Sequence, residues 1–137
     1  MGKDGRYAVV GLGVDATSYA EATTRIIAWA EAGRSAYVVA ANAYTAMQAH
    51  DSPVVARDVE GADLVTPDGM PLVWMLRLHG VQNASRVYGP TLMLHVCAAA
   101  EKEQIPIALY GGRPESLVEL ERELLRRFPR LRIACRI

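Results

Sequence analysis

The amino-acid sequence predicts an α/β protein, a Rossmann-like parallel sheet of about five strands with helices on both faces. Short, continuously apolar runs alternate with longer segments of helical character along the whole chain. Strands buried on both faces read as unbroken apolar runs, and parallel strands need a helix-sized connection between them. At 137 residues the chain can build a sizeable core. We therefore expect residues 1–137 to form a single domain.

Apolar runs closed by glycine, asparagine or a charged stretch are the predicted strands, at residues 7–11, 36–41, 64–66, 106–110 and 131–137. Cap residues and the helical spacing of apolar side chains place helices between them. The helices are expected at residues 19–32, 43–50, 53–60, 71–79, 90–104 and 114–128. Ser18 and Asn42 are candidate N-caps, and either Asp51 or Ser52 caps the next helix, with Pro53 as its first helical residue. Residues 11–16 are expected to form a loop.

Composition excludes several classes of protein. The chain is 51% hydrophobic and 22% charged, which is typical of a globular domain and not of a disordered one. Lys plus Arg equals Asp plus Glu, 15 against 15, which argues against a nucleic-acid-binding surface as the main purpose. The two cysteines, Cys97 and Cys135, make neither a disulfide framework nor a metal cluster, and Cys97 is expected to be a small buried hydrophobe. The polar start and the absence of an apolar stretch of roughly 20 residues predict a cytoplasmic protein.

Ligands of open α/β sheets bind at the carboxyl ends of the strands. Those ends place residues 11–15, Asn42, Asp68 and residues 111–113 at one edge of the predicted sheet. The first of these stretches matches the dinucleotide fingerprint G-x-G-x-x-A, which makes an NAD(P)-binding oxidoreductase an alternative. Two features argue against it. The helix cap, Ser18, comes a turn too late, and the second strand ends in Asn42 and not in an acidic residue.

Asp68 and Asn42 each have a structural and a functional interpretation. Pro67-Asp68-Gly69 is a turn signal, and asparagine is a common helix cap. A carboxylate on a rigid strand end also suits a general base. A side-chain amide at the neighbouring strand end suits binding of a substrate hydroxyl or carbonyl. From composition alone, the turn and the cap are favoured.

Three further features suit binding of a diphosphate. Arg86 precedes an apolar helix, and guanidinium matches phosphate oxygens in a bidentate fork. The backbone amides near Gly89 and Thr91 lie at the start of that helix. Gly111-Gly112 is a second strand-to-helix turn that can approach a diphosphate. The three histidines do not cluster, and no D-x-D pair is present, so we expect no metal site.

The order of these pieces resembles that of a known family. The matching segments, in order, are Asn42, Asp51-Ser-Pro53, Ala62-Asp63-Leu-Val-Thr-Pro-Asp68-Gly69, an apolar helix with Trp74, Gly80, Arg86-Val-Tyr-Gly89 and Ile107-Ala-Leu-Tyr-Gly-Gly112. From about Tyr7 to its last residue, the chain resembles the WecG/TagA/CpsF glycosyltransferases (glycosyltransferase family 26). Each motif alone is unspecific, and the combination carries the resemblance.

The resemblance implies a Rossmann-like bacterial enzyme of cell-surface polymer synthesis, for teichoic acid linkage units, enterobacterial common antigen, capsule or exopolysaccharide. Such enzymes transfer a sugar, often N-acetylmannosamine, from a UDP-sugar to a polyprenyl-diphosphate-linked acceptor at the inner face of the cell membrane. The anomeric configuration inverts, and no metal or other cofactor is expected. The resemblance makes Asp68 the catalytic base, Asn42 an active-site residue and Arg86 the residue that meets the diphosphate leaving group.

The chain departs from the family pattern in three places. Ala40 stands where a threonine is usual, and Met70 or Pro71 where a glycine is usual. The resemblance also implies that the chain lacks the family's C-terminal part, and that exposed apolar surface could drive homo-oligomerisation. A nucleotide-binding module without activity is therefore the leading alternative to a transferase.

Overall fold

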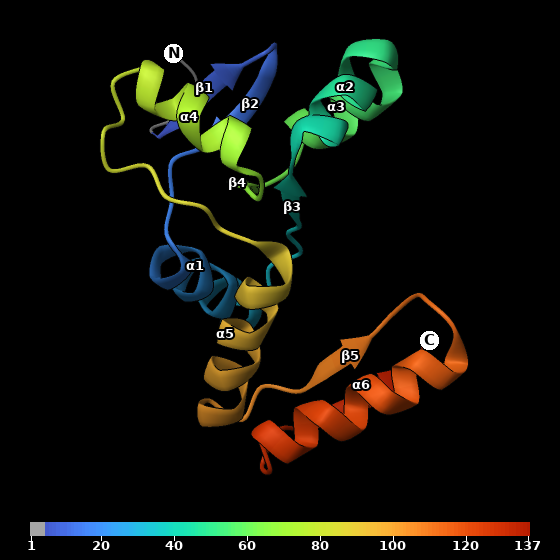
Figure 1. The fold of residues 1–137 in the computed structure, drawn as a ribbon. Coiled ribbons are helices and arrows are strands. Elements are labelled where there is room, and N and C mark those ends of the chain that lie inside the picture. The colour runs from blue at the N-terminus through green and yellow to red at the C-terminus, as the bar shows by residue number, and fades with distance from the viewer. Residues whose placement is uncertain (1–4) are drawn as a thin grey trace.

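The computed structural model describes residues 5–137 and has a mixed α/β fold (Figure 1). The strands of these residues are β1 Arg6–Val9, β2 Leu12–Asp15, β3 Val38–Ala41, β4 Leu64–Pro67, β5 Ile107–Leu109 and β6 Ile133–Arg136. The helices are α1 Tyr19–Glu31, α2 Ala43–Asp51, α3 Pro53–Glu60, α4 Met70–Leu78, α5 Gly89–Lys102 and α6 Pro114–Arg127. The predicted mixture of strands and helices is confirmed, and the predicted helices form within a few residues of their expected ends.

The predicted five-stranded parallel sheet does not form among the described residues. The strands make three separate pairs, of which β3–β4 and β5–β6 are parallel and β1–β2 is antiparallel. β3 and β5 each leave one edge unpaired, and a cleft between them interrupts the sheet. The alternation of apolar runs and helices predicts which segments are strands. It does not predict which of these strands pair when they are far apart in the sequence.

The predicted loop at residues 11–16 is wrong, because Leu12–Asp15 is strand β2 of a tight hairpin. The two residues that join the strands, Val10 and Gly11, have φ angles of 52° and 76°. Positive φ at both central residues is the mark of a type I′ hairpin turn, for which glycine is favoured and valine is unusual. A turn at a β-branched residue gives no sequence signal, so the hairpin was not predictable from residue types.

The hairpin is fixed to β4 by a largely buried ion pair. The Arg6 guanidinium donates to both carboxylate oxygens of Asp15, at 2.9 and 2.8 Å, and also to the carbonyl of Ala62 at 3.0 Å. Asp15 Oδ2 accepts the N–H of Val65 at 2.7 Å. A Cβ at Gly13 would lie 2.9 Å from the Arg6 side chain, so the absence of a side chain there lets the arginine cross the strand.

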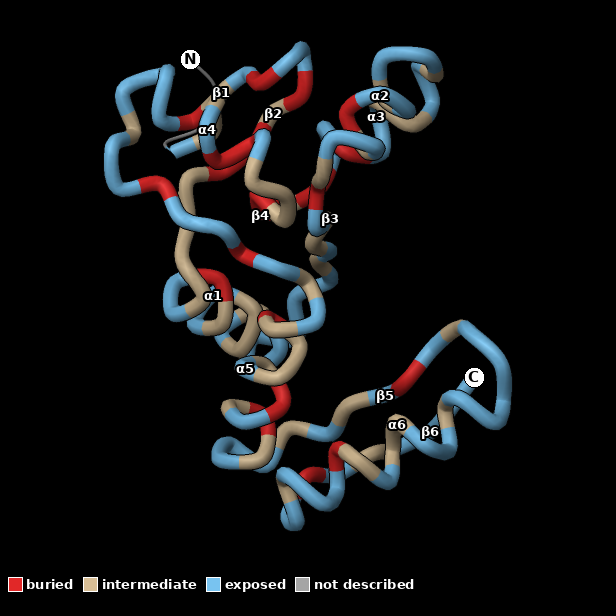
Figure 2. Tube along the Cα trace, viewed as in Figure 1, coloured by how far each residue is buried: buried red, intermediate tan, exposed pale blue. Residues whose placement is uncertain are grey.

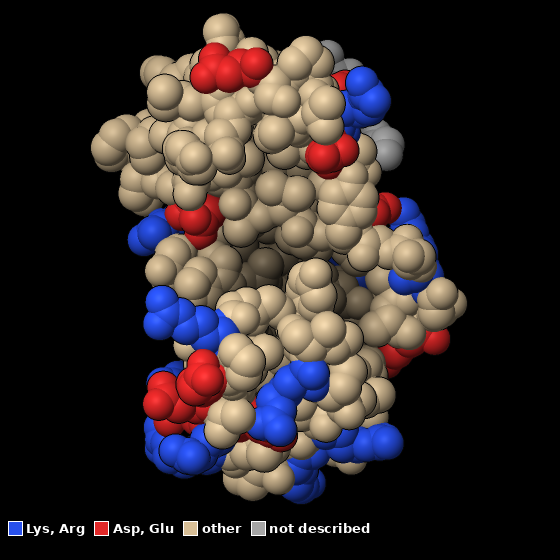
Figure 3. Space-filling view, turned by 90° about the vertical axis from the view of Figure 1, so that its right-hand side faces the viewer, with Lys and Arg blue, Asp and Glu red and all other residues tan. Residues whose placement is uncertain are grey.

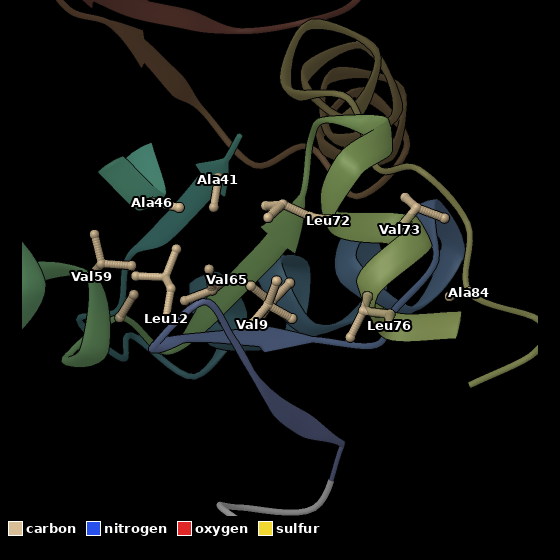
Figure 4. Close-up of a cluster of buried hydrophobic side chains, with 12 residues drawn as sticks. Val9, Leu12, Ala41, Ala46, Val59, Val65, Leu72, Val73, Leu76 and Ala84 are labelled. Atoms are coloured by element: carbon tan, nitrogen blue, oxygen red, sulfur yellow. The ribbon is translucent and has the colours of Figure 1, made fainter. Parts of the chain in front are cut away.

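Two helix layers enclose the β3–β4 pair. On one side, α4, the hairpin and part of α2 and α3 form the cluster drawn in Figure 4, which includes Val65, Leu72 and Leu76. On the other side, Leu64 packs with Ala22 of α1 and with Val87 and Leu92. The second parallel pair is covered by α5 and α6 through Cys97, Leu109, Leu124 and Leu131. Figure 2 shows the contrast, with buried segments along β4 and mostly exposed residues along β6.

Candidate active site

Asp68 lies where the most buried strand of the molecule ends. All four residues of β4 are buried, and Pro67 is the register partner of Ala41 at the end of β3. The Asp68 N–H donates to the carbonyl of Ala41 at 2.8 Å, which continues the strand pairing by one residue. The carboxylate is therefore held on a rigid support at the carboxyl ends of two parallel strands.

One oxygen of this carboxylate is anchored and the other is not. Asp68 Oδ1 accepts the N–H of Gly89, the first residue of α5, at 2.7 Å. No hydrogen bond reaches Oδ2 from any residue between 5 and 137. A hydrogen bond from a backbone N–H orients the group, while Oδ2 remains available to accept a proton.

The segment before α5 runs alongside the end of β4 and supports the Asp68 loop. Arg86 Nε donates to the Asp68 carbonyl at 2.6 Å, and the N–H of Val87 donates to the Pro67 carbonyl at 2.9 Å. The Arg86 guanidinium also lies 4.4 Å from the centre of the Tyr88 ring. The structure thus brings Arg86 to Asp68 through the backbone, and its two Nη nitrogens make no hydrogen bond within the described part of the chain.

Asn42 caps α2, as its structural interpretation predicts. Its Oδ1 accepts the Thr45 N–H at 3.0 Å, and the Thr45 hydroxyl reaches back to the Asn42 backbone N–H in a capping box. A Cβ at Gly69 would lie 3.4 Å from Asn42 Cβ, so the asparagine and the Asp68 loop are neighbours. The Asn42 Nδ2 group donates to none of the residues from 5 to 137, so the cap leaves it free to contact a ligand.

A cleft of about 560 Å³ reaches Gly89, the hydrogen-bond partner of Asp68, whereas Asp68, Asn42 and Arg86 themselves do not line it. It separates the free edges of β3 and β5, with α5 between them, and Figure 3 shows a hollow with uncharged walls on this face. Gly89 and Ala40 line it together, and a Cβ at Gly89 would lie only 3.3 Å from Ala40 Cβ. Glycine at this position therefore lets α5 approach β3 and present its N–H to Asp68.

The remaining predicted residues lie at or near this cleft. Gly111 lines the wall opposite Gly89, and both Gly111 and Gly112 have positive φ, 93° and 82°. Thr91 follows Gly89 in the first turn of α5 but is not a lining residue. Tyr110 also lines the cleft and belongs to no predicted motif; its only signal is its position between an apolar run and Gly111. β4 pairs with one edge of β3, and β5 lies across the cleft from the other edge, so the order of the strands reverses here. Open α/β sheets bind ligands at such a reversal.

The dinucleotide fingerprint lies away from a strand-to-helix junction. Gly11 is in the hairpin turn and Gly13 is inside β2, while α1 begins only at Tyr19 behind the Ser18 cap. A pyrophosphate would therefore not meet a helix N-terminus at these glycines, as the fingerprint requires. Within residues 5–137 no three His, Cys, Asp or Glu side chains form a group that could hold a metal ion. No helix in that range is both long and apolar enough to cross a bilayer.

Comparison with known families matches residues 7–137 to the glycosyl transferase WecG/TagA/CpsF family. The match spans nearly the whole chain and includes each segment of the candidate site, from Asn42 through Asp68 and Arg86 to Gly112. The chain belongs to the WecG/TagA/CpsF family, whose members are glycosyltransferases of cell-surface polysaccharide synthesis.

Proposed function

We propose that this protein is an inverting glycosyltransferase that uses a UDP-sugar donor and a polyprenyl-diphosphate-linked acceptor. The transferred sugar is N-acetylmannosamine or a related hexosamine, and the acceptor places the enzyme at the inner face of the cell membrane. The observation that carries the proposal is the Asp68 carboxylate, which is anchored through Oδ1 to Gly89, a residue that lines the cleft, and whose Oδ2 has no hydrogen bond within residues 5–137. Family membership supplies the reaction class.

The reaction needs one proton transfer and one displacement. Asp68 Oδ2 takes the proton of the acceptor hydroxyl as that oxygen attacks the anomeric carbon of the donor. The bond from the anomeric carbon to the diphosphate oxygen breaks as the new glycosidic bond forms, and UDP departs with the electron pair. Attack from the face opposite the leaving group inverts the configuration at the anomeric carbon.

The departing diphosphate needs positive charge or N–H donors. Arg86 can supply charge through its two Nη nitrogens while Nε stays on the Asp68 carbonyl. Because Arg86 would contact both the Asp68 loop and the diphosphate, binding of the donor would help to hold the Asp68 carboxylate in place. The amides of Gly112 and Thr91 are the further donors we assign to the diphosphate, because the Gly111 N–H already donates to the Ile137 carbonyl. Asn42 Nδ2 is the donor we assign to a sugar hydroxyl. The mechanism uses no metal.

Replacement of Asp68 by asparagine tests this assignment. Asp68→Asn keeps the shape and the acceptor for Gly89 but removes the base, so UDP release with a lipid-linked acceptor analogue should fall about a thousandfold. The melting temperature and the affinity for UDP should stay near wild type. Asp51→Asn, at an exposed carboxylate at the end of α2, is the matched control. Turnover by Asp68→Asn at the wild-type rate would refute the base.

A nucleotide-binding module without turnover is the second candidate, and the openness of the fold favours it. The accessible surface is 8608 Å² for a 14.9 kDa chain. A compact globular protein of that mass exposes about 7,000 Å². An open cleft admits water, which weakens electrostatic stabilisation of a transition state. Calorimetric binding of UDP together with no UDP release from a UDP-sugar would decide for the module.

A further inference from the structure

Tyr110 is a large aromatic side chain left in the open at the end of β5. It is 85% exposed, although it directly follows Leu109, which is 7% exposed and part of the core. Isolated exposed aliphatic residues are common on protein surfaces, but an aromatic ring on the wall of a cleft offers a flat face to a ligand. Packing within the protein therefore does not explain why an aromatic residue lies at this position.

The backbone on both sides fixes the position of this residue. The Ile137 N–H donates to the Leu109 carbonyl at 2.8 Å, and the Gly111 N–H donates to the Ile137 carbonyl at 2.9 Å. These two bonds connect Leu109 and Gly111, on either side of Tyr110, to Ile137, the residue that follows β6. Tyr110 itself lines the cleft. The side chain thus projects from a fixed backbone and not from a mobile loop.

The surroundings leave room against the ring. Ala108, two residues earlier along the strand, also lines the cleft and has only a methyl side chain. After Tyr110 the chain turns through Gly111 and Gly112 at positive φ, and a Cβ on either glycine would meet no atom within 4 Å. Among residues 5–137, the turn that follows Tyr110 therefore carries no side chain at Gly111 or Gly112, and the ring stays exposed.

We infer that the Tyr110 ring is the stacking platform for the nucleobase of the donor. The inference rests on the proposed function, because it assumes that the cleft holds a nucleotide. A base stacked on Tyr110 would place the diphosphate beside Gly111 and direct the sugar towards Gly89 on the facing wall, and so towards Asp68, which is hydrogen-bonded to Gly89. Aromatic stacking tolerates any base, so this contact contributes affinity for a nucleotide, and the choice of uracil belongs to other contacts.

The test is the affinity of the full chain for UDP, measured by calorimetry for four proteins. Tyr110→Ala should weaken binding about tenfold, since stacking on an aromatic side chain contributes on that scale. Tyr110→Phe keeps the ring and should bind within about twofold of wild type. Tyr44→Ala is the control, because Tyr44 is 67% exposed on α2 and does not line the cleft. In turnover, Tyr110→Ala should raise the KM for the donor and leave kcat unchanged.

The outcomes distinguish a failure of the proposed function from a failure of the stacking role of Tyr110. Wild-type chain that fails to bind UDP removes the proposed function, and the role of Tyr110 falls with it. Wild-type binding that survives in Tyr110→Ala overturns the stacking role alone. Equal losses in Tyr110→Phe and Tyr110→Ala would assign the effect to the hydroxyl, and a lowered melting temperature of Tyr110→Ala would assign it to folding; both also overturn stacking. Upfield shifts of the uracil protons on binding to wild type, absent with Tyr110→Ala, provide a direct check.

Discussion

The two parallel strand pairs of this protein are both short and mostly apolar in sequence, but they differ in the elements that surround them. All four residues of β4 are buried, whereas β6 has one half-buried residue and three exposed ones. Both segments are short and mostly apolar. The β3–β4 pair has helices on both faces, and the β5–β6 pair packs its core against α5 and α6. Apolar character therefore marks a strand, while the elements around it decide how deeply it is buried.

The same contrast divides the candidate site. Asp68, the base we propose, follows the enclosed pair, and Tyr110 and Gly111 follow strand β5 of the exposed pair at the cleft. Proton transfer requires a fixed geometry, and a rigid, buried strand provides it. A donor-binding wall can tolerate movement, because a ligand must enter and leave. The division predicts that substitutions near β4 affect stability strongly and that matched ones near β6 do not.

Ion pairs give the largest expected difference. Asp15→Ala leaves the Arg6 guanidinium and the Val65 N–H without their acceptor in a nearly buried place, which should cost about 3–5 kcal/mol of unfolding free energy. The matched ion pair near β6 joins Arg136 to Glu121, whose side chains are 42% and 27% exposed. Glu121→Ala should therefore lower the unfolding free energy by less than about 1 kcal/mol. Urea denaturation of both variants measures the two values. Similar losses would mean that the two pairs are equally enclosed.

The two cysteines probe the same difference without a change of sequence. Cys97 is 2% exposed, and burial raises the pKa of its thiol, so it stays protonated and protected at neutral pH. Cys135, on β6, is exposed. Alkylation should modify Cys135 at the rate of a free thiol and Cys97 at least about a hundredfold more slowly, because Cys97 reacts only through local opening. Mass spectrometry of peptides over time gives both rates; comparable rates would contradict the burial of α5.

These comparisons indicate which features were predictable from the sequence. The predicted caps Ser18 and Asn42, and Ser52 of the two candidates Asp51 and Ser52, all accept the backbone N–H three residues later, because a cap is a local interaction between neighbours in the chain. Burial of Cys97 was also expected from its apolar segment and is confirmed. The hydrogen bond from Gly89 to Asp68 joins residues 21 positions apart, and the gap between β3 and β5 depends on every element that packs around it. No residue type encodes such contacts by itself, so the strand ends were predictable and their arrangement was not.

Two residues with unfavourable backbone angles extend the comparison to the turns. Val10 in the hairpin and Gln104 after α5 have positive φ, 52° and 56°. A β-branched residue adopts this conformation with strain, so Val10→Asn should stabilise the protein by about 1 kcal/mol. Gln104→Gly should gain less, because the Gln104 side chain donates to the Glu101 carbonyl at 2.6 Å and glycine would lose that bond. Thermal melts of the two variants rank the effects, and a loss of stability in Val10→Asn would show that the valine side chain makes packing contacts that outweigh the strain.

The smallest expected effect lies on the outer face of α6. Hydrogen bonds from Arg126, and then from Arg127, lower the pKa of Glu123 from 4.5 to about 2. A lowered pKa means that the pair stabilises the fold above pH 4.5 and that this contribution fades as the pH falls towards 2. The Glu123 side chain is 44% exposed, so water and salt screen the pair, and holding three long side chains together costs entropy. Glu123→Gln should therefore leave the melting temperature unchanged within error at pH 7 in physiological salt. A clear drop in melting temperature at pH 7 that shrinks as the pH falls from 4.5 towards 2 would mean that this surface is enclosed in solution. The contrast between the buried β3–β4 pair and the exposed β5–β6 pair would then not hold.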